Sequence, residues 1–350
     1  MQSPDARGPG SATSIAGRAI APLPERDASG NPPLAGRVAV VTGGSRGIGL
    51  AVARGLVTRG ASVVCTGRDD ATGARAVAEL QECAGAGATA TFLQCDFESR
   101  RSIDDAAARI VETHPRLDIL VHNAAWVAER WQLTDAGVES QFAVNHLAAV
   151  QLTHRLLEPL RSAAPARIVV TASQVERGAA TDFESLLHPD AAHGYQPNRV
   201  YAQTKLANML FSQALARRLP PNEITVNALH PGVVRTGLLD RLEQRGTHAR
   251  ASGLLTRLRE TLGKALRRHG LRAPVRDWAI DTSAGAFTTL AVATAPTLAG
   301  VSGEYFADGR HAIASVASRD VALADALWRL SAHCLGLPDD WTETRQAWRP

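Results

Sequence analysis

A tyrosine and a lysine lie four residues apart in the segment "VYAQTKLANMLFSQALARRL", and such a pair can carry out acid–base chemistry. The apolar residues of this segment recur at helical spacing, so Tyr201 and Lys205 share one face of a predicted helix. A neighbouring ammonium favours a phenolate and lowers the pKa of a tyrosine. We therefore expect Tyr201 to give a proton to a carbonyl oxygen or to take one from an alcohol. The alternative is an ordinary pair on a helix surface.

Lysine is rare in this chain, which makes its position informative. Of the 38 Lys and Arg residues, only Lys205 and Lys264 are lysines. A lysine is a compact ammonium whose pKa shifts readily, whereas an arginine stays charged. Lys205 is therefore predicted to do something that arginine cannot, while Lys264, in a basic stretch, is attributed to drift.

Two further polar residues are candidates for the same site. Ser173 ends a predicted strand at 166–173, at the carboxyl edge where parallel sheets bind ligands, and its hydroxyl could hydrogen-bond a substrate oxygen. Asn145 is a polar residue in the apolar stretch "FAVNHLAAV". It could hold a water that connects Lys205 to solvent, or it could be a core amide with its hydrogen bonds satisfied.

A glycine loop predicts a dinucleotide site. The segment "VVTGGSRGIGLAVARGL" follows a predicted strand and opens a helix, with glycines at Gly43, Gly47 and Gly49. Glycines let the backbone approach a pyrophosphate, and the helix N-terminus offers N–H donors. The alternative is a tight structural turn.

The tip of the second predicted strand bears on the choice of cofactor. An acidic residue there would bind the ribose 2′-OH of NAD, but this chain has Gly67 followed by Arg68, and an arginine accommodates the 2′-phosphate of NADP. Arg46 could add a second contact. Asp69 and Asp70 leave NAD open, although NADP(H) is the predicted cofactor.

Three other side chains follow predicted strands at the same edge. Asp96 could meet the adenine or cap the helix that starts near Ser99. Trp126 and Trp131 could line an apolar substrate pocket or fasten their own loop.

The hydrophobic pattern predicts one α/β domain with a Rossmann-type doubly wound parallel sheet over residues 34–336. Buried strands are predicted at 37–43, 61–67, 90–96, 117–123, 166–173, 224–230 and 303–308. Helices are predicted near 47–59, 70–84, 99–113, 134–162, 199–218, 282–293 and 319–335. Residues 1–33 are predicted to be a disordered tail, 237–272 a helical substrate-lid insertion and 337–350 a C-terminal tail.

Composition excludes several classes of protein. The net charge of +4 is local, because residues 235–276 carry 11 basic and 3 acidic side chains, so a general nucleic-acid binder is not expected. That basic stretch could attract an anionic substrate or simply be solvated. The chain has no apolar run of about 18 residues, which predicts no transmembrane segment. The four cysteines lack metal-ligand spacing, so we expect reduced thiols, no metal site and a cytoplasmic protein.

These motifs together resemble the short-chain dehydrogenases/reductases, over about residues 34–336. The resemblance is carried by the glycine loop, Asn123-Ala124-Ala125, Asn145, Ser173, Tyr201 with Lys205, and "HPGVVRT" at 230–236. Phrases such as "FAVNHLAAVQLTHRLL" and "LAGVSGEYF" look most like the retinol-dehydrogenase-like and WW-domain-oxidoreductase-like branch. That branch tends to use NADP and to act on hydrophobic aldehydes, ketones or alcohols. The resemblance also implies a homodimer or homotetramer.

The resemblance implies a role for each matching residue. Tyr201 would be the acid/base, Lys205 would bind the nicotinamide ribose, Ser173 would steady the substrate and Asn145 would organise a relay water. The expected cofactor-binding residues are Gly43, Ser45, Arg46, Gly47, Ile48, Gly49, Arg68, Asp96, Phe97, Asn123, Ala124, Tyr201, Lys205, Pro231, Gly232, Val233 and Thr236.

The chain departs from the family pattern at two positions. Where the family has Asn-Asn-Ala-Gly, this chain has His122-Asn123-Ala124-Ala125, which adds a methyl group near the cofactor. His122 is interpreted as a packing residue. An NADP-dependent oxidoreductase is the first hypothesis; a non-catalytic NADP-binding sensor or scaffold on the same fold is the second, and epimerase or dehydratase chemistry fits the glycine spacing less well.

Overall fold

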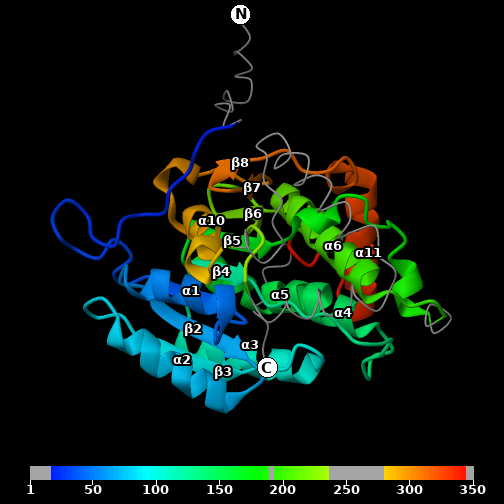
Figure 1. Ribbon diagram of the computed structural model, residues 1–350, viewed down its shortest axis with the longest axis horizontal. Coiled ribbons are helices and arrows are strands. Elements are labelled where there is room, and N and C mark those ends of the chain that lie inside the picture. The colour runs from blue at the N-terminus through cyan, green and yellow to red at the C-terminus, as the bar shows by residue number, and fades with distance from the viewer. Residues whose placement is uncertain (1–16, 189–192, 236–279, 344–350) are drawn as a thin grey trace, which may run out of the picture.

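The computed structural model describes residues 17–188, 193–235 and 280–343, which form an eight-stranded sheet with helices on both faces (Figure 1). The strands lie in the order β3-β2-β1-β4-β5-β6-β7-β8; all neighbours are parallel except β7 and β8. Their bounds are β1 Val38–Thr42, β2 Ser62–Gly67, β3 Ala90–Gln94, β4 Ile119–His122, β5 Ala166–Thr171, β6 Ile224–His230, β7 Tyr305–Ala307 and β8 Arg310–His311. The order reverses between β1 and β4, and ligands of open parallel sheets bind outside the carboxyl ends of the strands at such a point.

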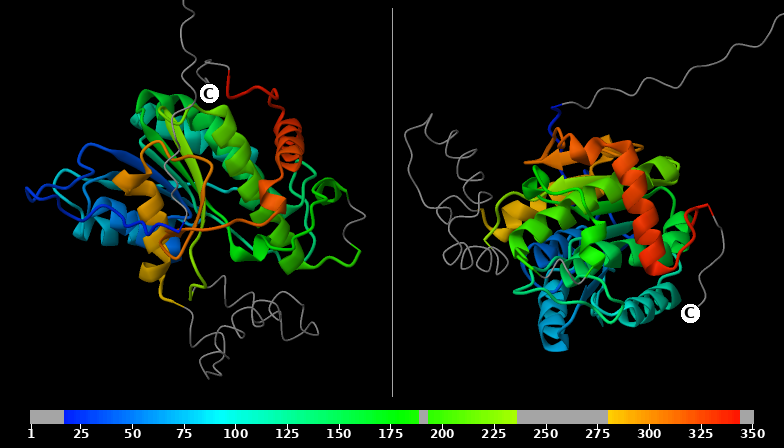
Figure 2. Two further views of the ribbon diagram at one scale, coloured as in Figure 1. Left: turned by 90° about the horizontal axis from the view of Figure 1, so that it is seen from above. Right: turned by 90° about the vertical axis from the view of Figure 1, so that its right-hand side faces the viewer.

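The helices cover the sheet in two layers, which Figure 2 shows from above and from the side. Their bounds are α1 Gly47–Val57, α2 Asp70–Glu82, α3 Arg100–Thr113, α4 Ser140–Phe142, α5 Ala148–Ser162, α6 Pro197–Arg218, α10 Thr282–Thr294 and α11 Val321–Leu335. Helices α1 and α10 pack together on one face, whereas α3, α5, α6 and α11 cover the other.

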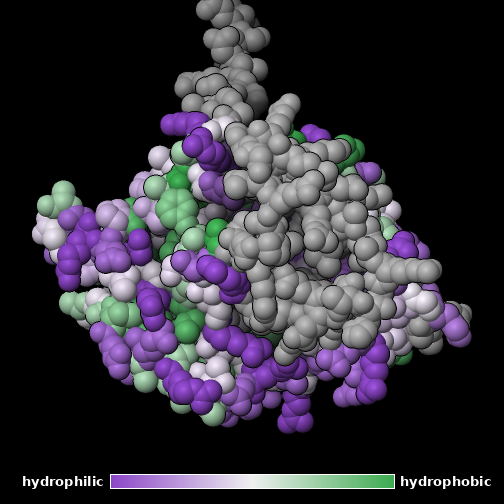
Figure 3. Space-filling view, viewed as in Figure 1, coloured by the Kyte–Doolittle hydropathy of each residue, from purple (hydrophilic) through white to green (hydrophobic). Residues whose placement is uncertain are grey.

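Successive strand residues point to opposite faces, and both faces are buried. In β1, Val40 belongs to the core under α3, α5 and α6, while Ala39 and Val41 belong to the core under α1 and α10. This explains the near-continuous apolar strands of the sequence. The outer faces of α2 and α3 are mostly hydrophilic (Figure 3). The doubly wound parallel fold predicted from the sequence is therefore confirmed.

The helix predicted at 134–162 is shorter and less regular than expected. Residues 134–139 form a turn, in which Gly137 has a φ of 74° and Thr134 N donates to Val138 O over 2.9 Å. The Glu139 side chain then accepts a hydrogen bond from Phe142 N and starts α4. A π-helical turn over Ala143–Leu147 separates α4 from α5 and carries Asn145. Single π-turns inside helices occur frequently at functional sites.

The predicted disordered tail was wrong for residues 17–33, which contact the domain. Ile20 is buried and its N–H donates to Gly309 O over 2.7 Å. Leu23 N donates to Thr294 Oγ1 over 3.0 Å, and Arg59 Nε donates to Leu23 O over 2.5 Å. One apolar anchor and these backbone hydrogen bonds hold a segment whose composition alone predicted disorder.

The C-terminal boundary also differs from the prediction. Trp341 is buried and stacks on Trp328 of α11 with ring centroids 4.8 Å apart, and Trp328 Nε1 donates to Asp339 O over 2.7 Å. Trp341 therefore attaches residues 337–343 to the domain, which extends beyond the boundary predicted at residue 336. The predicted lid at 237–272 lies outside the described residues.

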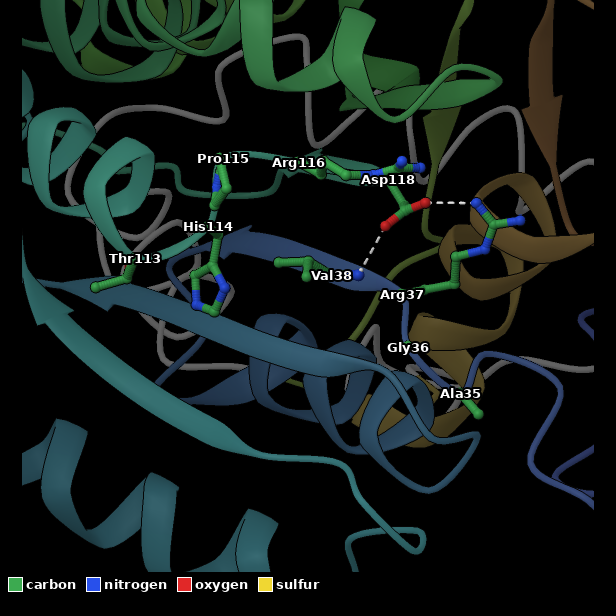
Figure 4. Close-up of a pocket in the computed structure, with 9 residues that line it drawn as sticks. All are labelled: Ala35, Gly36, Arg37, Val38, Thr113, His114, Pro115, Arg116 and Asp118. Atoms are coloured by element: carbon green, nitrogen blue, oxygen red, sulfur yellow. Dashed lines mark hydrogen bonds and ion pairs between the residues drawn. The ribbon is translucent and has the colours of Figure 1, made fainter.

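The amino edge of the sheet holds a pocket of about 450 Å³ beneath β1 and β4 (Figure 4). Its one buried carboxylate, Asp118, accepts hydrogen bonds from Val38 N over 2.9 Å and from Arg37 Nη1 over 2.5 Å. Both oxygens are thus occupied in joining the starts of β1 and β4, so Asp118 acts as a structural residue.

Candidate active site

The glycine loop between β1 and α1 brings the backbone close to the end of β4. Gly43 has a φ of 64°, a conformation that favours glycine. At Gly49, an added Cβ would lie 2.2 Å from Gly43 O and 2.5 Å from Asn123 Nδ2. Asn123 fastens this arrangement, because its Nδ2 donates to Thr42 O over 3.0 Å and its backbone N to Thr42 Oγ1 over 2.9 Å. These hydrogen bonds fasten the loop to the end of β4, and its residues line an adjacent cleft.

We predict that Gly49→Ala destabilises the fold by about 1–3 kcal/mol, because a methyl group does not fit beside the Gly43 carbonyl. Dinucleotide affinity should fall as well, because the loop must shift to make room. Thermal unfolding and NADPH fluorescence titration measure the two effects. Gly300→Ala is the control: its Cβ meets nothing within 4 Å but its φ is 71°, so it should cost stability without changing NADPH affinity.

A cleft of about 470 Å³ opens above this loop, a size typical of small-molecule sites. Its lining consists of Gly43, Ser45, Arg46, Gly47, Ile48, Gly49, Gly67, Arg68, Asp69, Thr72, Asp96, Phe97, Glu98, Asn123, Ala124, Ala125, Trp126 and Val144. The structure thus gathers the predicted residues from the ends of β1, β2, β3 and β4 in one place. Sequence reasoning missed Thr72, Glu98 and Val144, which follow strands or sit on helices without any distinctive pattern.

The far end of the cleft is polar. Arg68 Nη1 lies 3.7 Å from Glu98 Oε1, and both side chains are partly exposed. Asp69 is already engaged, since its side chain caps α2 by accepting from Thr72 N over 2.7 Å. Hydrogen bonding by the Thr72 side chain, and after it by the Thr72 backbone N–H, lowers the pKa of Asp69.

Asp96 lines the cleft but does not cap α3. Its Oδ1 accepts from Glu98 N over 3.0 Å, which stabilises the turn after β3. Ser99 caps α3 by accepting from Ser102 N over 3.3 Å. The capping alternative for Asp96 was therefore wrong.

Tyr201 and Lys205 lie together on α6 and are both buried. The Lys205 Nζ lies 5.6 Å from the centroid of the Tyr201 ring and donates to Thr171 O over 3.0 Å. Burial raises the pKa of Tyr201 above its ordinary value and lowers the pKa of Lys205 to about 8. The expectation that the ammonium lowers the tyrosine pKa was wrong for this structure, because burial alone shifts the pKa of both groups, each towards its neutral form.

Ser173 follows β5 at the same edge of the sheet. Its Oγ accepts from Val175 N over 3.4 Å and so caps a 3₁₀ turn over Gln174–Glu176. The buried Glu176 side chain holds this turn, because it accepts from Ser315 N over 3.2 Å. The serine therefore sits on an anchored turn near the end of the strand.

Asn145 joins two parts of the site. Its Oδ1 accepts from Trp126 N over 2.7 Å, and its Nδ2 donates to Trp126 O over 2.9 Å and to Thr204 Oγ1 over 3.1 Å. Thr204 Oγ1 in turn donates to Tyr201 O over 2.8 Å. The Asn145 side chain thus matches the satisfied amide that the sequence left open, and it holds the loop after β4 against α6.

Of the two tryptophans proposed to line the substrate pocket, only one lies at the cleft, and His122 is a packing residue. Trp126 lines the cleft, whereas Trp131 packs edge-on against Tyr195 with ring centroids 5.5 Å apart. His122 is buried, lies with Nε2 2.8 Å from Thr153 Oγ1, and has its pKa lowered to about 3 by burial, as suits a packing residue.

The segment that follows β6 lies at the carboxyl edge of the sheet. Pro231 and Gly232 follow the strand directly, and Gly232 has a φ of 88°. Val233 O accepts from Ile280 N over 2.9 Å. Thr236, the remaining predicted residue, lies outside the described residues.

A doubly wound sheet with a glycine-loop cleft and a buried Tyr–Lys pair at its carboxyl edge defines a nucleotide-dependent oxidoreductase of the Rossmann type. The family model for short chain dehydrogenases matches residues 37–183. Retinol dehydrogenase 14 of Mus musculus is 33% identical over 327 residues, covering 90% of this chain and 91% of the relative. The chain therefore belongs to the short-chain dehydrogenase/reductase family, in its retinol-dehydrogenase-like branch, and is an NAD(P)-dependent oxidoreductase.

Solved structures agree on the fold. An uncharacterised protein from Mycobacterium paratuberculosis has a TM-score of 0.64 and 26% identity, covering 88% of this chain and 97% of that one. L-Sorbose reductase from Gluconobacter frateurii, complexed with NADPH and L-sorbose, has a TM-score of 0.58 and 23% identity, covering 78% and 95%. Within the described part of the chain, no helix is both long and apolar enough to cross a bilayer.

Proposed function

We propose that this protein is an NADP-dependent oxidoreductase that interconverts a hydrophobic aldehyde or ketone and its alcohol. The observation that carries the proposal is the buried Tyr201–Lys205 pair at the carboxyl edge of the sheet, which Asn145 connects to the cleft of about 470 Å³ above the glycine loop. A bound nicotinamide would supply or accept the hydride. The relatives named retinol dehydrogenases support a hydrophobic alcohol or aldehyde as substrate.

This proposal gives each residue near the pair a defined role. Tyr201 holds its hydroxyl proton, since burial raises its pKa, and donates it to a carbonyl oxygen during reduction. Ser173 hydrogen-bonds the same oxygen. Lys205 carries a positive charge that stabilises the phenolate left on Tyr201 and binds the nicotinamide ribose. Asn145 holds the loop after β4 against α6 through its hydrogen bonds to Trp126 and Thr204.

The cofactor would bind along the cleft. The glycine loop and the start of α1 would hold the pyrophosphate, with Asn123 and Ala124 beside it. Asp96 and Phe97 would border the adenine. Pro231, Gly232, Val233 and Thr236 would border the nicotinamide amide. Trp126, which lines the cleft, would border an apolar substrate, whereas Trp131 packs on Tyr195 and would fasten its own loop.

Turnover separates this function from the alternative of a non-catalytic NADP-binding sensor. The protein is mixed with NADPH and a panel of hydrophobic aldehydes and ketones, and NADPH absorbance is followed. We expect its loss with at least one compound. Tight NADPH binding without turnover of any compound would favour the sensor.

Arg68→Asp tests the choice of NADP over NAD. Arg68 stands at the end of β2 with only a 3.7 Å contact to Glu98, and Asp69 is engaged in capping α2. Removing the guanidinium should weaken NADPH binding by about 1.5–3 kcal/mol, which raises the NADPH dissociation constant at least about tenfold. The affinity for NADH should increase. Glu98→Gln is the matched control, which should keep the NADPH preference. Unchanged NADPH selectivity in Arg68→Asp would exclude this arginine as the phosphate ligand.

Location and assembly remain predictions of the same proposal. The four cysteines, Cys65, Cys83, Cys95 and Cys334, are free thiols in the structure, and a cytoplasmic location stays a prediction. Light scattering on the purified chain decides whether it forms the homodimer or homotetramer that the family resemblance implies.

A further inference from the structure

The short turn that carries Ser173 depends on contacts outside itself. It covers Gln174–Glu176, and Ser173 caps it: Ser173 Oγ accepts from Val175 N over 3.4 Å, and Ser173 O accepts from Glu176 N over 3.1 Å. A 3₁₀ turn has hydrogen bonds of poorer geometry than an α-helix, and a cap bond of 3.4 Å is long. Neighbouring segments must therefore set the place of this turn.

The Glu176 side chain joins the turn to a residue that lies 139 positions further along the chain. Glu176 is fully buried, and both of its carboxyl oxygens are engaged by this one residue. Ser315 N donates to Oε1 over 3.2 Å, and Ser315 Oγ donates to Oε2 over 2.5 Å. Burial raises the pKa of Glu176, and the hydrogen bonds from Ser315 counteract that shift. Because the carboxyl group is closed to solvent, these two hydrogen bonds are the ones that satisfy it.

The hydroxyl hydrogen of Ser315 is directed at Glu176. Ser315 Oγ accepts from Ser318 N over 3.1 Å, and Ser318 Oγ donates to Ser315 O over 3.0 Å. Ser318 Oγ also lies 3.1 Å from Ser315 Oγ, but the 2.5 Å distance to Glu176 Oε2 is shorter and places the hydrogen there. Ser318 is fully buried, so the segment around Ser315 is itself held in place.

Two further contacts attach the same segment, residues 313–318, on both sides of the serine; we call it the clamp segment. Arg177 Nη2, on the residue after the turn, donates to Ile313 O. Ala314 is buried in one apolar cluster with Ala172, the residue before the serine. The clamp segment is thus attached to the chain both before the serine and after its turn.

We propose that Glu176 is a positioning residue that sets the place of the Ser173 hydroxyl through its hydrogen bonds to the clamp segment, an inference that rests on the proposed function. The hydroxyl must lie within hydrogen-bond distance of the substrate oxygen, so a small displacement of the turn weakens that contact. Glu176 does not line the cleft, and both of its oxygens are occupied by Ser315. It therefore acts on the reaction only through Ser173.

Glu176→Leu tests the proposal, because it removes both acceptor oxygens and keeps much of the volume. It should lower kcat for the carbonyl about tenfold and leave the NADPH dissociation constant unchanged. In a Ser173→Ala background the same substitution should cause no further loss, because no hydroxyl remains to be placed. A further tenfold loss in that background would show that Glu176 acts by another route and would overturn the proposal.

Glu176→Gln should restore turnover to nearly the wild-type rate. Its amide oxygen can accept from Ser315 N, and its amide nitrogen can donate to Ser315 Oγ, whose own hydrogen then goes to Ser318 Oγ, 3.1 Å away. A glutamine variant as slow as the leucine variant would contradict placement by hydrogen bonds. If Glu176→Leu does not fold, Ser315→Ala takes its place: it removes one of the two bonds and should lower kcat about threefold, again only while Ser173 is present.

Asp118 provides a matched control at the opposite edge of the sheet. Its side chain is 8% exposed, and it accepts one hydrogen bond from a backbone, Val38 N over 2.9 Å, and one from a side chain, Arg37 Nη1 over 2.5 Å. Asp118→Leu should lower the melting temperature as Glu176→Leu does, but it should leave kcat unchanged. Equal losses of kcat in the two variants would mean that kcat only follows stability, and the positioning role would be abandoned.

Amide hydrogen exchange of residues 173–179 gives a readout that does not depend on activity. Within this stretch Glu176 N donates to Ser173 O, and Ala179 N donates to Glu176 O over 3.1 Å. Exchange should be faster in Glu176→Leu and should keep the wild-type rate in Glu176→Gln and Asp118→Leu. If the wild type turns over no carbonyl, the proposed function fails while the exchange rates still report the contact with the clamp segment. Unchanged exchange in Glu176→Leu contradicts that contact whether or not the protein is active.

Discussion

Replacement of Tyr201 by phenylalanine should reduce turnover by at least about 100-fold, because the variant has no proton to give to the carbonyl oxygen. The ring itself would remain in its buried place, where it is 6% exposed and where Lys205 Nζ lies 5.6 Å from its centroid. The cleft lined by the glycine loop does not include this side chain, so the NADPH dissociation constant should stay close to that of the wild type. Steady-state kinetics and NADPH fluorescence titration measure the two quantities.

The same substitution at a second buried tyrosine is the control. Tyr305 in β7 is 4% exposed, and burial raises its pKa above the ordinary value as it does for Tyr201. Tyr305→Phe should keep turnover, because its hydroxyl has no task in the proposed reaction. If Tyr201→Phe kept the wild-type rate, the acid/base assignment would have to be abandoned.

The pH dependence follows from the raised pKa of Tyr201. Its hydroxyl stays protonated through the neutral range, so the reduction should not lose rate between about pH 6 and pH 8 through ionisation of this group. In the oxidative direction the phenolate is required, and the rate should rise with pH over the same range.

Most of the fold followed from local chemistry in the sequence. The strand segment "RVAVVTG" is apolar throughout because β1 is buried on both faces, and all seven predicted strands are present within a few residues of their predicted ends. The glycine loop was equally predictable, because no side chain larger than hydrogen fits at Gly49. Such features depend on nearby residues in the chain or on one backbone conformation. Both restrict the residue types that can occur, so both can be recognised in the sequence.

What the sequence did not predict depends on contacts between distant segments. The Lys205 ammonium is held by the Thr171 carbonyl, 34 residues away, and backbone carbonyls carry no sequence signature. The backbone of Ile20 is held by a hydrogen bond to Gly309 O, and Trp341 is held by stacking on Trp328. Neither contact could be inferred from neighbours in the sequence. The pKa of Tyr201 was predicted in the wrong direction, because helical spacing gives the proximity of Lys205 but not the extent of burial.

Replacement of Lys205 by methionine should abolish turnover and yet stabilise the folded protein. Burial lowers the lysine pKa from 10.5 to about 8, a difference that corresponds to about 3 kcal/mol for keeping the charge in the core at neutral pH. Methionine fills a similar volume without a charge. The hydrogen bond to Thr171 O is lost, at about 1 kcal/mol, so a net gain of about 2 kcal/mol in the free energy of unfolding is expected. Urea unfolding at pH 7 measures it.

The pH dependence of that gain identifies its cause. Between about pH 8 and pH 10.5 the unfolded lysine keeps its proton while the folded one releases it, so the unfolded state binds more protons and wild-type stability from this group rises with pH. The advantage of Lys205→Met should therefore be largest below about pH 8 and shrink towards pH 10.5. Buried Cys65 and Cys95 have raised pKa values and act in the opposite direction at high pH, but they do so equally in both proteins, so the difference between the two curves isolates the lysine.

Lys205→Arg completes the comparison, because it keeps a charge that cannot be released. This variant should be inactive like Lys205→Met, but it should not gain stability at any pH, since the buried site would still hold a positive charge. A chain that uses arginine at nearly every other basic position would then have kept this lysine at a cost in stability, because the reaction needs an ammonium there. Equal stability of the wild type and Lys205→Met at pH 7 would refute that explanation.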